Sequence, residues 1–273
     1  MTNPDKAAIF NRTNAEYWEA NAEVWTKHSR AGFDIYRDAL HTPAFLTMLP
    51  DIAGLKGIDI GCGEGSNTRW LARKGAQMTG IDLAPSFIRH ATEYETGCEA
   101  KKSLGIHYQV ADALHLPVND AEFDFASAFM SMMDMPQQAD VLKEVYRVLK
   151  PQGFFQFTIL HPCFVPPFRQ NIRDQNGNVT AVQVSDYFAN IDGRVETWWF
   201  STVPQHERDQ TQPFNIQRFH RTLSEWISFI VNAGFVIEAS VEPMASEALA
   251  AHEPVVADTR VTPIAWIVRV RKP

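Results

Sequence analysis

A short apolar strand that runs into three closely spaced glycines constrains the fold of this chain more than any other feature. The segment GIDIGCGEGSN (residues 57–67) places Gly61, Gly63 and Gly65 directly after the strand GIDI and directly before a helix. Glycines at such a turn allow the backbone to bend sharply and to approach a ligand closely. The segment therefore predicts a strand, a turn and a helix, with a ligand held at the turn.

Short apolar strands alternate with amphipathic helices along most of the chain. The predicted strands cover residues 57–60, 77–82, 106–110, 123–129, 153–160, 235–240 and 264–270. Four helices are predicted in this part of the chain. One covers residues 67–74, one begins at Pro85, one contains Leu142, Val145 and Leu149 at helical spacing, and one runs from Thr222 to Gly234. Alternation of this kind implies a parallel sheet covered on both faces. We therefore expect an α/β fold, a doubly wound Rossmann-like sheet of about seven strands, mostly parallel with an antiparallel last strand.

Two segments lie outside this regular pattern. The first is helical, and the capping-box spacing of Thr13 and Glu16 predicts that its main helix begins near Thr13. The second is rich in proline, asparagine, glutamine and aromatic residues and predicts irregular strands. We expect three parts: N-terminal helices over the ligand site (1–50), a core (51–160 and 220–273) and an inserted lid that selects the substrate (161–219).

Charge and composition exclude several kinds of partner. The formal net charge of −7 disfavours a nucleic-acid backbone or an anionic membrane, and no apolar stretch reaches the roughly 18 residues of a transmembrane helix. The N-terminus lacks a secretory apolar run. Three widely spaced cysteines, Cys62, Cys98 and Cys163, fit free thiols in a reducing cytoplasm, and the histidines have no metal-ligand spacing. We expect a cytoplasmic protein with no nucleic acid, membrane or metal as partner.

An acidic residue follows the second predicted strand. Asp82 lies nineteen residues after Gly63, where a carboxylate can accept hydrogen bonds from both hydroxyls of a ribose. A dinucleotide site usually has a third glycine where this chain has Ser66, and Glu64 would repel a pyrophosphate in the loop. The sequence therefore predicts a nucleoside-containing cofactor without a phosphate.

Five motifs, taken in order, resemble those of the class I S-adenosylmethionine-dependent methyltransferases, in the broad group that acts on small molecules. They are the strand with GCGEG, GIDLAP (80–85), VADALHLP (110–117), FDFASAFMSMMDMP (123–136) and EVYRVLKPQGFF (144–155). The resemblance is strong over residues 56–160 and weaker over residues 220–271. It implies a methyltransferase fold with S-adenosyl-L-methionine as cofactor.

The resemblance also implies which residues bind each part of the cofactor. Asp82 would bind the ribose, and Leu83, Asp112 and Ala113 would bind the adenine. The residues near the methionine end would be Asp59, Gly61, Cys62, Gly63 and the backbone of Phe129 and Met130. Many relatives carry a histidine in the loop after the fourth strand, where this chain has Met133 and Asp134. The catalytic residues of relatives therefore do not transfer to this chain.

A general base is needed only for some acceptors. A phenol, an alcohol or a protonated amine must lose a proton, and histidine is the usual base near neutral pH. His161 follows the fifth strand and is the first candidate base, and His220 is the second. Asp134 could orient either histidine or bind the acceptor. A purely structural role for both histidines remains the alternative.

The aromatic residues of the insertion predict the acceptor site. Long loops that begin at a ligand crevice are usually lids or binding loops. We expect an aromatic pocket for a small, planar or apolar acceptor, lined by Tyr17, Trp25, Phe164, Trp198 and Trp199. The alternative is that these aromatic side chains are buried in a homodimer interface.

The sequence as a whole favours an S-adenosylmethionine-dependent methyltransferase that acts on an O or N atom of a small molecule. Two other classes of protein stay open. One is a non-catalytic protein that binds S-adenosylmethionine, and the other is a nicotinamide-dependent oxidoreductase, which Ser66 and Glu64 disfavour.

Overall fold

A seven-stranded sheet forms the centre of the computed structural model, which describes residues 4–97 and 103–273. The strand order is β10-β11-β5-β4-β1-β2-β3. All pairs from β3 to β5 are parallel, and β11 is antiparallel to both β5 and β10. The strands are β1 (Lys56–Ile60), β2 (Gln77–Asp82), β3 (His107–Val110), β4 (Phe123–Phe129), β5 (Leu149–Leu160), β10 (Val236–Val241) and β11 (Ala265–Arg271). The predicted fold class, with its antiparallel last strand, is confirmed.

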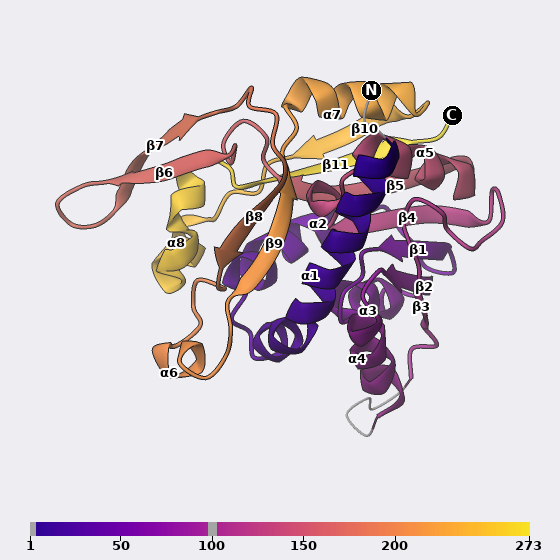
Figure 1. Cartoon of the computed structure of the whole chain (residues 1–273), viewed down its shortest axis with the longest axis horizontal. Helices are drawn as coiled ribbons and strands as arrows, with labels where there is room; N and C mark the ends of the chain where they lie inside the picture. The colour runs from indigo at the N-terminus through magenta and orange to yellow at the C-terminus, as the bar shows by residue number, and fades with distance from the viewer. Residues whose placement is uncertain (1–3, 98–102) are drawn as a thin grey trace.

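Helices cover both faces of this sheet (Figure 1). On one face α5 (Gln138–Val148) and α7 (Leu223–Asn232) bury Val141, Leu142, Val145, Trp226 and Ile230 in the main core cluster. On the other face α2 (Thr42–Met48) and α3 (Ser66–Arg73) pack on Met78, Phe125 and Phe154. The helix α4 (Pro85–Thr96) follows β2. Burial of the strands between two helical layers explains why their sequences are apolar without alternation.

The first helix is longer than the sequence predicted. It runs over α1 (Pro4–Arg30), so the predicted start near Thr13 is wrong. The Thr13 hydroxyl donates to the backbone oxygen of Ile9 at 2.9 Å, as a threonine within a helix does, and so caps nothing. A π-helical segment that the sequence did not predict, η1 (Tyr36–His41), connects α1 to α2.

The segment predicted as irregular strands forms two antiparallel hairpins, each with one shift in register. The first is β6 (Phe168–Arg173) with β7 (Val179–Ser185), and the second is β8 (Asp192–Trp198) with β9 (Phe214–Phe219). A short helix, α6 (Gln205–Arg208), lies between β8 and β9. The first hairpin extends away from the sheet, whereas the second runs beside α1 (Figure 1).

Side-chain hydrogen bonds join α1 to the second hairpin. The Asn21 amide donates to the backbone oxygen of Asn215 at 2.9 Å and accepts from its backbone N–H at 3.2 Å. Trp25 packs between Phe200 and Phe214, with ring centroids 4.8 and 4.7 Å away. The helix and the hairpin therefore form one layer above the carboxyl ends of the parallel strands.

The C-terminal third contains one correct helix prediction and several omissions. The predicted capping box of α7 is confirmed, because Thr222 accepts from the backbone of Glu225 while the Glu225 carboxylate accepts from the backbone of Thr222. Leu149, predicted in a helix, begins β5. Two short helices, α8 (Glu247–His252) and η3 (Pro254–Arg260), were not predicted. Within the described ranges, no helix has the length and apolarity that crossing a membrane requires. Cys98 lies outside the described residues.

The turn after β1 has the left-handed backbone that its glycines permit. Gly61, Gly63 and Gly65 have φ angles of +70°, +54° and +86°. A Cβ atom on Gly65 would overlap the Tyr108 hydroxyl, whereas a Cβ atom on Gly177, in the turn between β6 and β7, would meet no atom within 4 Å. Gly177 has nearly the same φ, +84°. The two glycines therefore differ in space and not in backbone conformation.

We expect Gly177→Ala to lower the free energy of unfolding by about 1–2 kcal/mol, the cost of a left-handed alanine. Gly65→Ala should lower it by a further ~1–3 kcal/mol, because the methyl group must also displace Tyr108. Urea denaturation of both variants measures the difference. Equal losses would show that the turn tolerates a side chain at Gly65.

Candidate active site

A cavity of about 610 Å³ opens at the carboxyl ends of the parallel strands. Its floor consists of the loops that follow β1, β2, β3 and β4, and its roof of α1, η1, β8 and β9. Small-molecule sites in open α/β sheets lie in this position and have volumes of roughly 300–1,000 Å³. The cavity is therefore large enough for a cofactor with a second ligand beside it.

Two buried carboxylates hold the glycine turn in place. Asp59 accepts hydrogen bonds from the hydroxyls of Thr68, at 2.6 Å, and Ser127, at 2.7 Å. Asp82 accepts from the backbone N–H of Gly63 at 2.8 Å and from that of Ala84 at 3.0 Å. Burial raises the pKa of Asp59, and it raises the pKa of Asp82 to about 6. Asp82 thus connects the loops after β1 and β2 and lines the floor of the cavity.

Cys62 lies in the same turn and is buried. Its backbone N–H donates to Ile81, and its sulfur lies 3.6 Å from the backbone oxygen of Gly63. Burial and the neighbouring carboxylates raise the pKa of the thiol well above its ordinary value. Cys62 is therefore an unreactive thiol that forms part of the cavity wall.

The opposite end of the floor is formed after β3. Asp112 accepts from the backbone N–H of Leu114 at 2.9 Å and from the side-chain amide of Asn11 at 2.6 Å. Leu83 and Ala113 line the cavity beside it. Asn11 belongs to α1, and a sequence separation of about a hundred residues hid this contact from sequence analysis.

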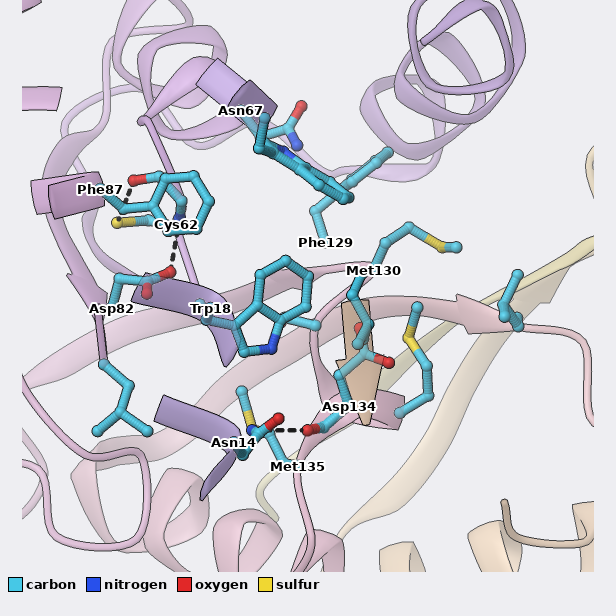
Figure 2. Close-up of a pocket in the computed structure, with 18 of the residues that line it drawn as sticks. Asn14, Trp18, Cys62, Asn67, Asp82, Phe87, Phe129, Met130, Asp134 and Met135 are labelled. Carbon is cyan, nitrogen blue, oxygen red and sulfur yellow. Dashed lines mark hydrogen bonds between the residues drawn. The ribbon is translucent and has the colours of Figure 1, made fainter. Parts of the chain in front are cut away.

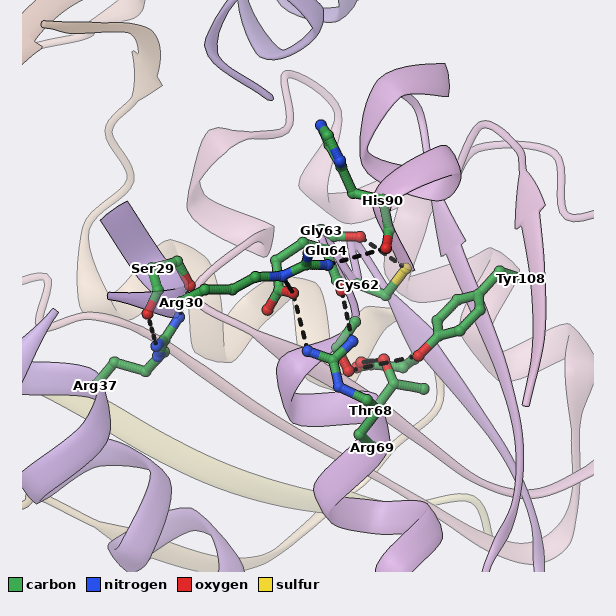
Figure 3. A network of polar contacts seen from close by, with 12 residues as sticks. Ser29, Arg30, Arg37, Cys62, Gly63, Glu64, Thr68, Arg69, His90 and Tyr108 are labelled. Carbon is green, nitrogen blue, oxygen red and sulfur yellow. Dashed lines mark hydrogen bonds and ion pairs between the residues drawn. The ribbon is translucent and has the colours of Figure 1, made fainter. Parts of the chain in front are cut away.

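Glu64 does not carry the uncompensated charge that the sequence suggested. Its carboxylate lies 2.9 Å from Arg30 Nε and 2.9 Å from Arg69 Nη2, and its backbone oxygen accepts from Arg69 Nη1 (Figure 3). Two guanidinium groups therefore neutralise this carboxylate. Repulsion by Glu64 is therefore a weaker reason than the glycine spacing to exclude a cofactor that contains a pyrophosphate.

The loop after β4 forms the middle of the cavity. Phe129 and Met130 line it, and Met130 has a left-handed backbone with a φ angle of +53°. Such a conformation is uncommon for a residue with a side chain. The Ser131 hydroxyl anchors the loop to β1 by donating to the backbone oxygen of Ile60 at 2.7 Å.

The aromatic wall contains three of the five residues predicted for it. Trp25, Trp198 and Trp199 line the cavity. Tyr17 is not among the lining residues, and Phe164 packs on His161 with ring centroids 4.9 Å apart. The structure therefore corrects the assignments of Tyr17 and Phe164. The predicted lid lines the cavity at Val165, at residues 196–201, and at Ile216 and Arg218, whereas the β6–β7 hairpin contributes no residue to the lining.

Other aromatic residues of the wall were not assigned from the sequence. Trp18 and Phe87 line the cavity, with ring centroids 6.2 Å apart. Trp18 lies centrally among the lining residues in Figure 2. Trp18 and Trp25 are seven residues apart and share one face of α1, and Tyr17 lies off that face.

The two histidines predicted as bases do not line the cavity. His161 is 3% exposed, its Nδ1 accepts from the backbone of Cys163, and its Nε2 lies 2.7 Å from Glu242. His220 is 6% exposed, and its Nε2 lies 2.8 Å from the backbone oxygen of Tyr187. Both imidazoles are thus hydrogen-bonded to other residues of the protein and lie outside the cavity lining. The structure therefore does not support the prediction that either histidine is the general base.

Asp134 is the one predicted acid–base residue that lines the cavity. Burial raises the pKa of its carboxyl to about 8, Arg218 opposes this rise, and Glu196 adds to it. Arg218 and Glu196 also line the cavity, 3.5 Å apart. This end of the cavity therefore combines aromatic side chains with a small group of titratable ones.

The π-helical segment adds a polar corner that the sequence analysis missed. Asp34, Arg37 and His41 line the cavity. Arg37 is held by Ser29 (Figure 3) and by Asp38. Burial raises the pKa of Asp34 to about 6. His41 is 3% exposed, its Nε2 has no hydrogen-bond partner among the described residues, and burial lowers its pKa to about 4. No sequence period marks a π-helix, so no pattern could have grouped these residues.

Comparisons with known proteins agree with this geometry. Residues 58–157 match the family model described as "Methyltransferase domain". The chain is 32% identical over 200 residues to a chloroplastic tocopherol O-methyltransferase of Arabidopsis thaliana, covering 62% of this chain and 55% of that protein. It is 29% identical over 164 residues to a malonyl-[acyl-carrier protein] O-methyltransferase of Salmonella typhimurium, covering 60% and 57%. The chain thus spans little more than half the length of these relatives.

A solved structure matches over more of the chain. The S-adenosylmethionine-dependent methyltransferase from Mesorhizobium loti is 25% identical and superimposes with a TM-score of 0.66, over 84% of this chain and 96% of that one. A structure from Listeria monocytogenes at 22% identity and a TM-score of 0.65 has the same fold. The motifs, the sheet and these comparisons together support a class I S-adenosylmethionine-dependent methyltransferase, with S-adenosylmethionine as the implied cofactor.

Proposed function

We propose that the chain transfers a methyl group from S-adenosylmethionine to an O or N atom of a small molecule. One observation carries this proposal: a single cavity contains both the motif residues of the cofactor floor and an aromatic wall that the cofactor motifs do not include. The relatives named above, a tocopherol O-methyltransferase and a malonyl-[acyl-carrier protein] O-methyltransferase, support a small-molecule acceptor.

The floor fits the nucleoside part of the cofactor. The Asp82 carboxylate has lone pairs left for a ribose diol after its two backbone bonds, and Asp112 can accept from an exocyclic amine. A Cβ atom on Gly63 would meet nothing within 4 Å, so the turn leaves open space where the ligand backbone would pass. When bound, S-adenosylmethionine supplies a methyl group already activated on a sulfonium.

The π-helical corner fits the amino-acid part. An ammonium and a carboxylate require opposite charges, and the acids of the glycine turn are already engaged, Glu64 by two arginines and Asp59 by two hydroxyls. Asp34 would take the ammonium and Arg37 the carboxylate. Arg37 has five N–H donors, of which contacts among the described residues use three.

The roof performs the remaining work. Methyl transfer needs the acceptor aligned with the activated methyl group and shielded from water, and alignment can supply several kcal/mol, up to ~7–11. Trp25, Trp198 and Trp199 would orient a planar acceptor and exclude water. Asp134 is the group in the lining that could hold a proton released by the acceptor.

The two alternative classes make different demands on the cavity. A non-catalytic protein needs space for the cofactor alone, whereas this cavity extends beyond the floor to Trp198 and Arg218. A nicotinamide enzyme would bind NAD(H), which the binding experiment below tests directly. For the setting, we propose the cytoplasm, since Cys62 and Cys163 are both free thiols. A homodimer stays a prediction.

We expect the protein to bind S-adenosylmethionine and S-adenosylhomocysteine, and Asp82→Ala to weaken both by ~1.5–3 kcal/mol, the contribution of hydrogen bonds to a charged group. Isothermal titration calorimetry measures this. Asp140→Ala, on the exposed side of α5, is the control, and Asp82→Asn keeps the shape of the loop if the alanine variant unfolds. Tight NAD(H) binding, or unchanged affinity in both Asp82 variants, contradicts the proposal.

We expect Arg37→Ala to weaken S-adenosylhomocysteine binding about tenfold or more. Its affinity for 5′-methylthioadenosine should not change, because this probe keeps the nucleoside and the sulfur but lacks the amino-acid end. Arg89→Ala, which removes an exposed arginine paired with Glu23 on α1, is the matched control. Equal losses for both probes would show that Arg37 stabilises the fold of the site and does not bind the carboxylate.

A further inference from the structure

The acceptor end of the cavity contains a buried side chain with an unused hydrogen-bonding atom. Asn14 is 4% exposed and lines the cavity. Its Nδ2 donates to the backbone oxygen of Asp134 at 2.9 Å (Figure 2). A carbonyl oxygen can only accept, so this bond fixes the orientation of the amide. Its Oδ1 is left without a donor among the described residues. An unsatisfied buried acceptor costs roughly 1–3 kcal/mol, and a ligand that donates would recover it.

A second acceptor lies beside the first. Asp134 is half-buried, lies next to Asn14 in Figure 2, and receives no hydrogen bond at its carboxylate from any described residue. Asn14 of α1 and Asp134 of the loop after β4 therefore both line the same cavity. This pairing joins segments about 120 residues apart.

The charges that face Asp134 nearly cancel. Arg218, from β9, lies 3.5 Å from the Glu196 carboxylate of β8, and its other contact is to the backbone oxygen of Val165. α1 presents the neutral Asn14 amide. Because burial raises the pKa of Asp134 to about 8, this carboxyl holds its proton over much of the neutral range in the free protein. The acceptor end therefore offers polar groups without a net charge to attract an ion.

These groups discriminate between classes of acceptor. A carboxylate would face the Asn14 amide oxygen and no unpaired cation, because Arg218 is paired with Glu196. An ammonium would lose its hydration in an aromatic cavity without a net opposite charge. A hydroxyl donates one hydrogen bond and carries no charge, and its ring can stack on Trp18 or Trp198, both of which line the cavity.

We propose that Asn14 and Asp134 bind an un-ionised hydroxyl of the acceptor, and that the acceptor is a phenol or a planar alcohol. This inference rests on the proposed function, since it names the substrate class of that same site. Methylation of a hydroxyl forms a C–O bond, leaves the electron pair of the broken C–S bond on sulfur, and releases one proton. Asp134 takes that proton at a carboxylate oxygen when it is ionised, as it increasingly is when the pH approaches about 8, while Asn14 holds the hydroxyl as a positioning residue.

The first test compares three probes with one ring each: phenol, benzoate and benzylamine. Each is titrated calorimetrically, with displacement where binding is weak, into the protein saturated with S-adenosylhomocysteine. Phenol should bind in the millimolar range or tighter, at least about tenfold more tightly than the other two. Asn14→Leu should abolish the preference, and Asn119→Leu, an exposed amide away from this cavity, should retain it. Benzoate or benzylamine binding as tightly as phenol, or no phenol binding, overturns the proposal.

The same titration distinguishes a failure of this inference from a failure of the proposed function on which it rests. If S-adenosylhomocysteine fails to bind, the proposed function fails. If it binds but phenol is not preferred, only the acceptor assignment fails.

A second test needs no ligand and covers variants that fold poorly. The pKa of Asp134 is raised in the folded protein from 3.8 to about 8, so its contribution to stability falls as pH rises through that range. Asp134→Asn keeps the shape and removes the titration. The Tm advantage of this variant over the wild type should therefore grow from about pH 4 to about pH 8. A constant difference would mean that Asp134 already has a partner, and would overturn its assignment as a free acceptor.

Discussion

The active site depends on α1 lying across the carboxyl ends of the parallel strands. Four side chains of this helix connect to four separate parts of the molecule: Asn11 to Asp112, Glu19 to the first turn of α4 at Ser86, Asn21 to Asn215 of β9, and Arg30 to Glu64 in the glycine turn. Without these contacts the floor would be an open crevice, as at the edge of any doubly wound sheet. With them, the crevice has a roof, and the polar groups beneath it are removed from water.

Removal from water changes the pKa values of three acids in the site. Burial raises the pKa values of Asp34 and Asp82 to about 6 and that of Asp134 to about 8. Each of these carboxyls is held at a cavity wall where its ionised form is disfavoured. Such groups lower stability and are retained where a ligand uses them, which is the usual relation between stability and activity. Each of these three carboxyls is thus placed where a ligand group could donate a hydrogen bond to it.

Local and global signals divide what the sequence could predict. The order of strands and helices, the floor residues Gly61, Gly63, Asp82 and Asp112, and the capping box of α7 follow from short-range spacing, and the structure has them where expected. The predicted start of α1 near Thr13 was wrong because residues with capping-box spacing can also occur inside a longer helix. His161 and His220 were chosen for their place in the chain, but their rings turn to partners, Glu242 and Tyr187, that no local pattern reveals. Asn14 and His41 could not be selected from the sequence, because only the folded chain brings them into the cavity wall.

The β8–β9 hairpin has a consequence for how this chain can diverge in sequence. Along β9 the side chains of Ile216 and Arg218 face the cavity, while Gln217 between them does not. Since alternate residues of a strand face opposite sides, a single exchange at one of these positions reshapes the roof and leaves every backbone bond of the floor unchanged. A one-residue insertion in the same strand would instead turn Arg218 out of the cavity and its neighbours into it. The hairpin should therefore tolerate substitutions better than insertions. Relatives with other acceptors should differ in the side chains of this hairpin more often than in its length.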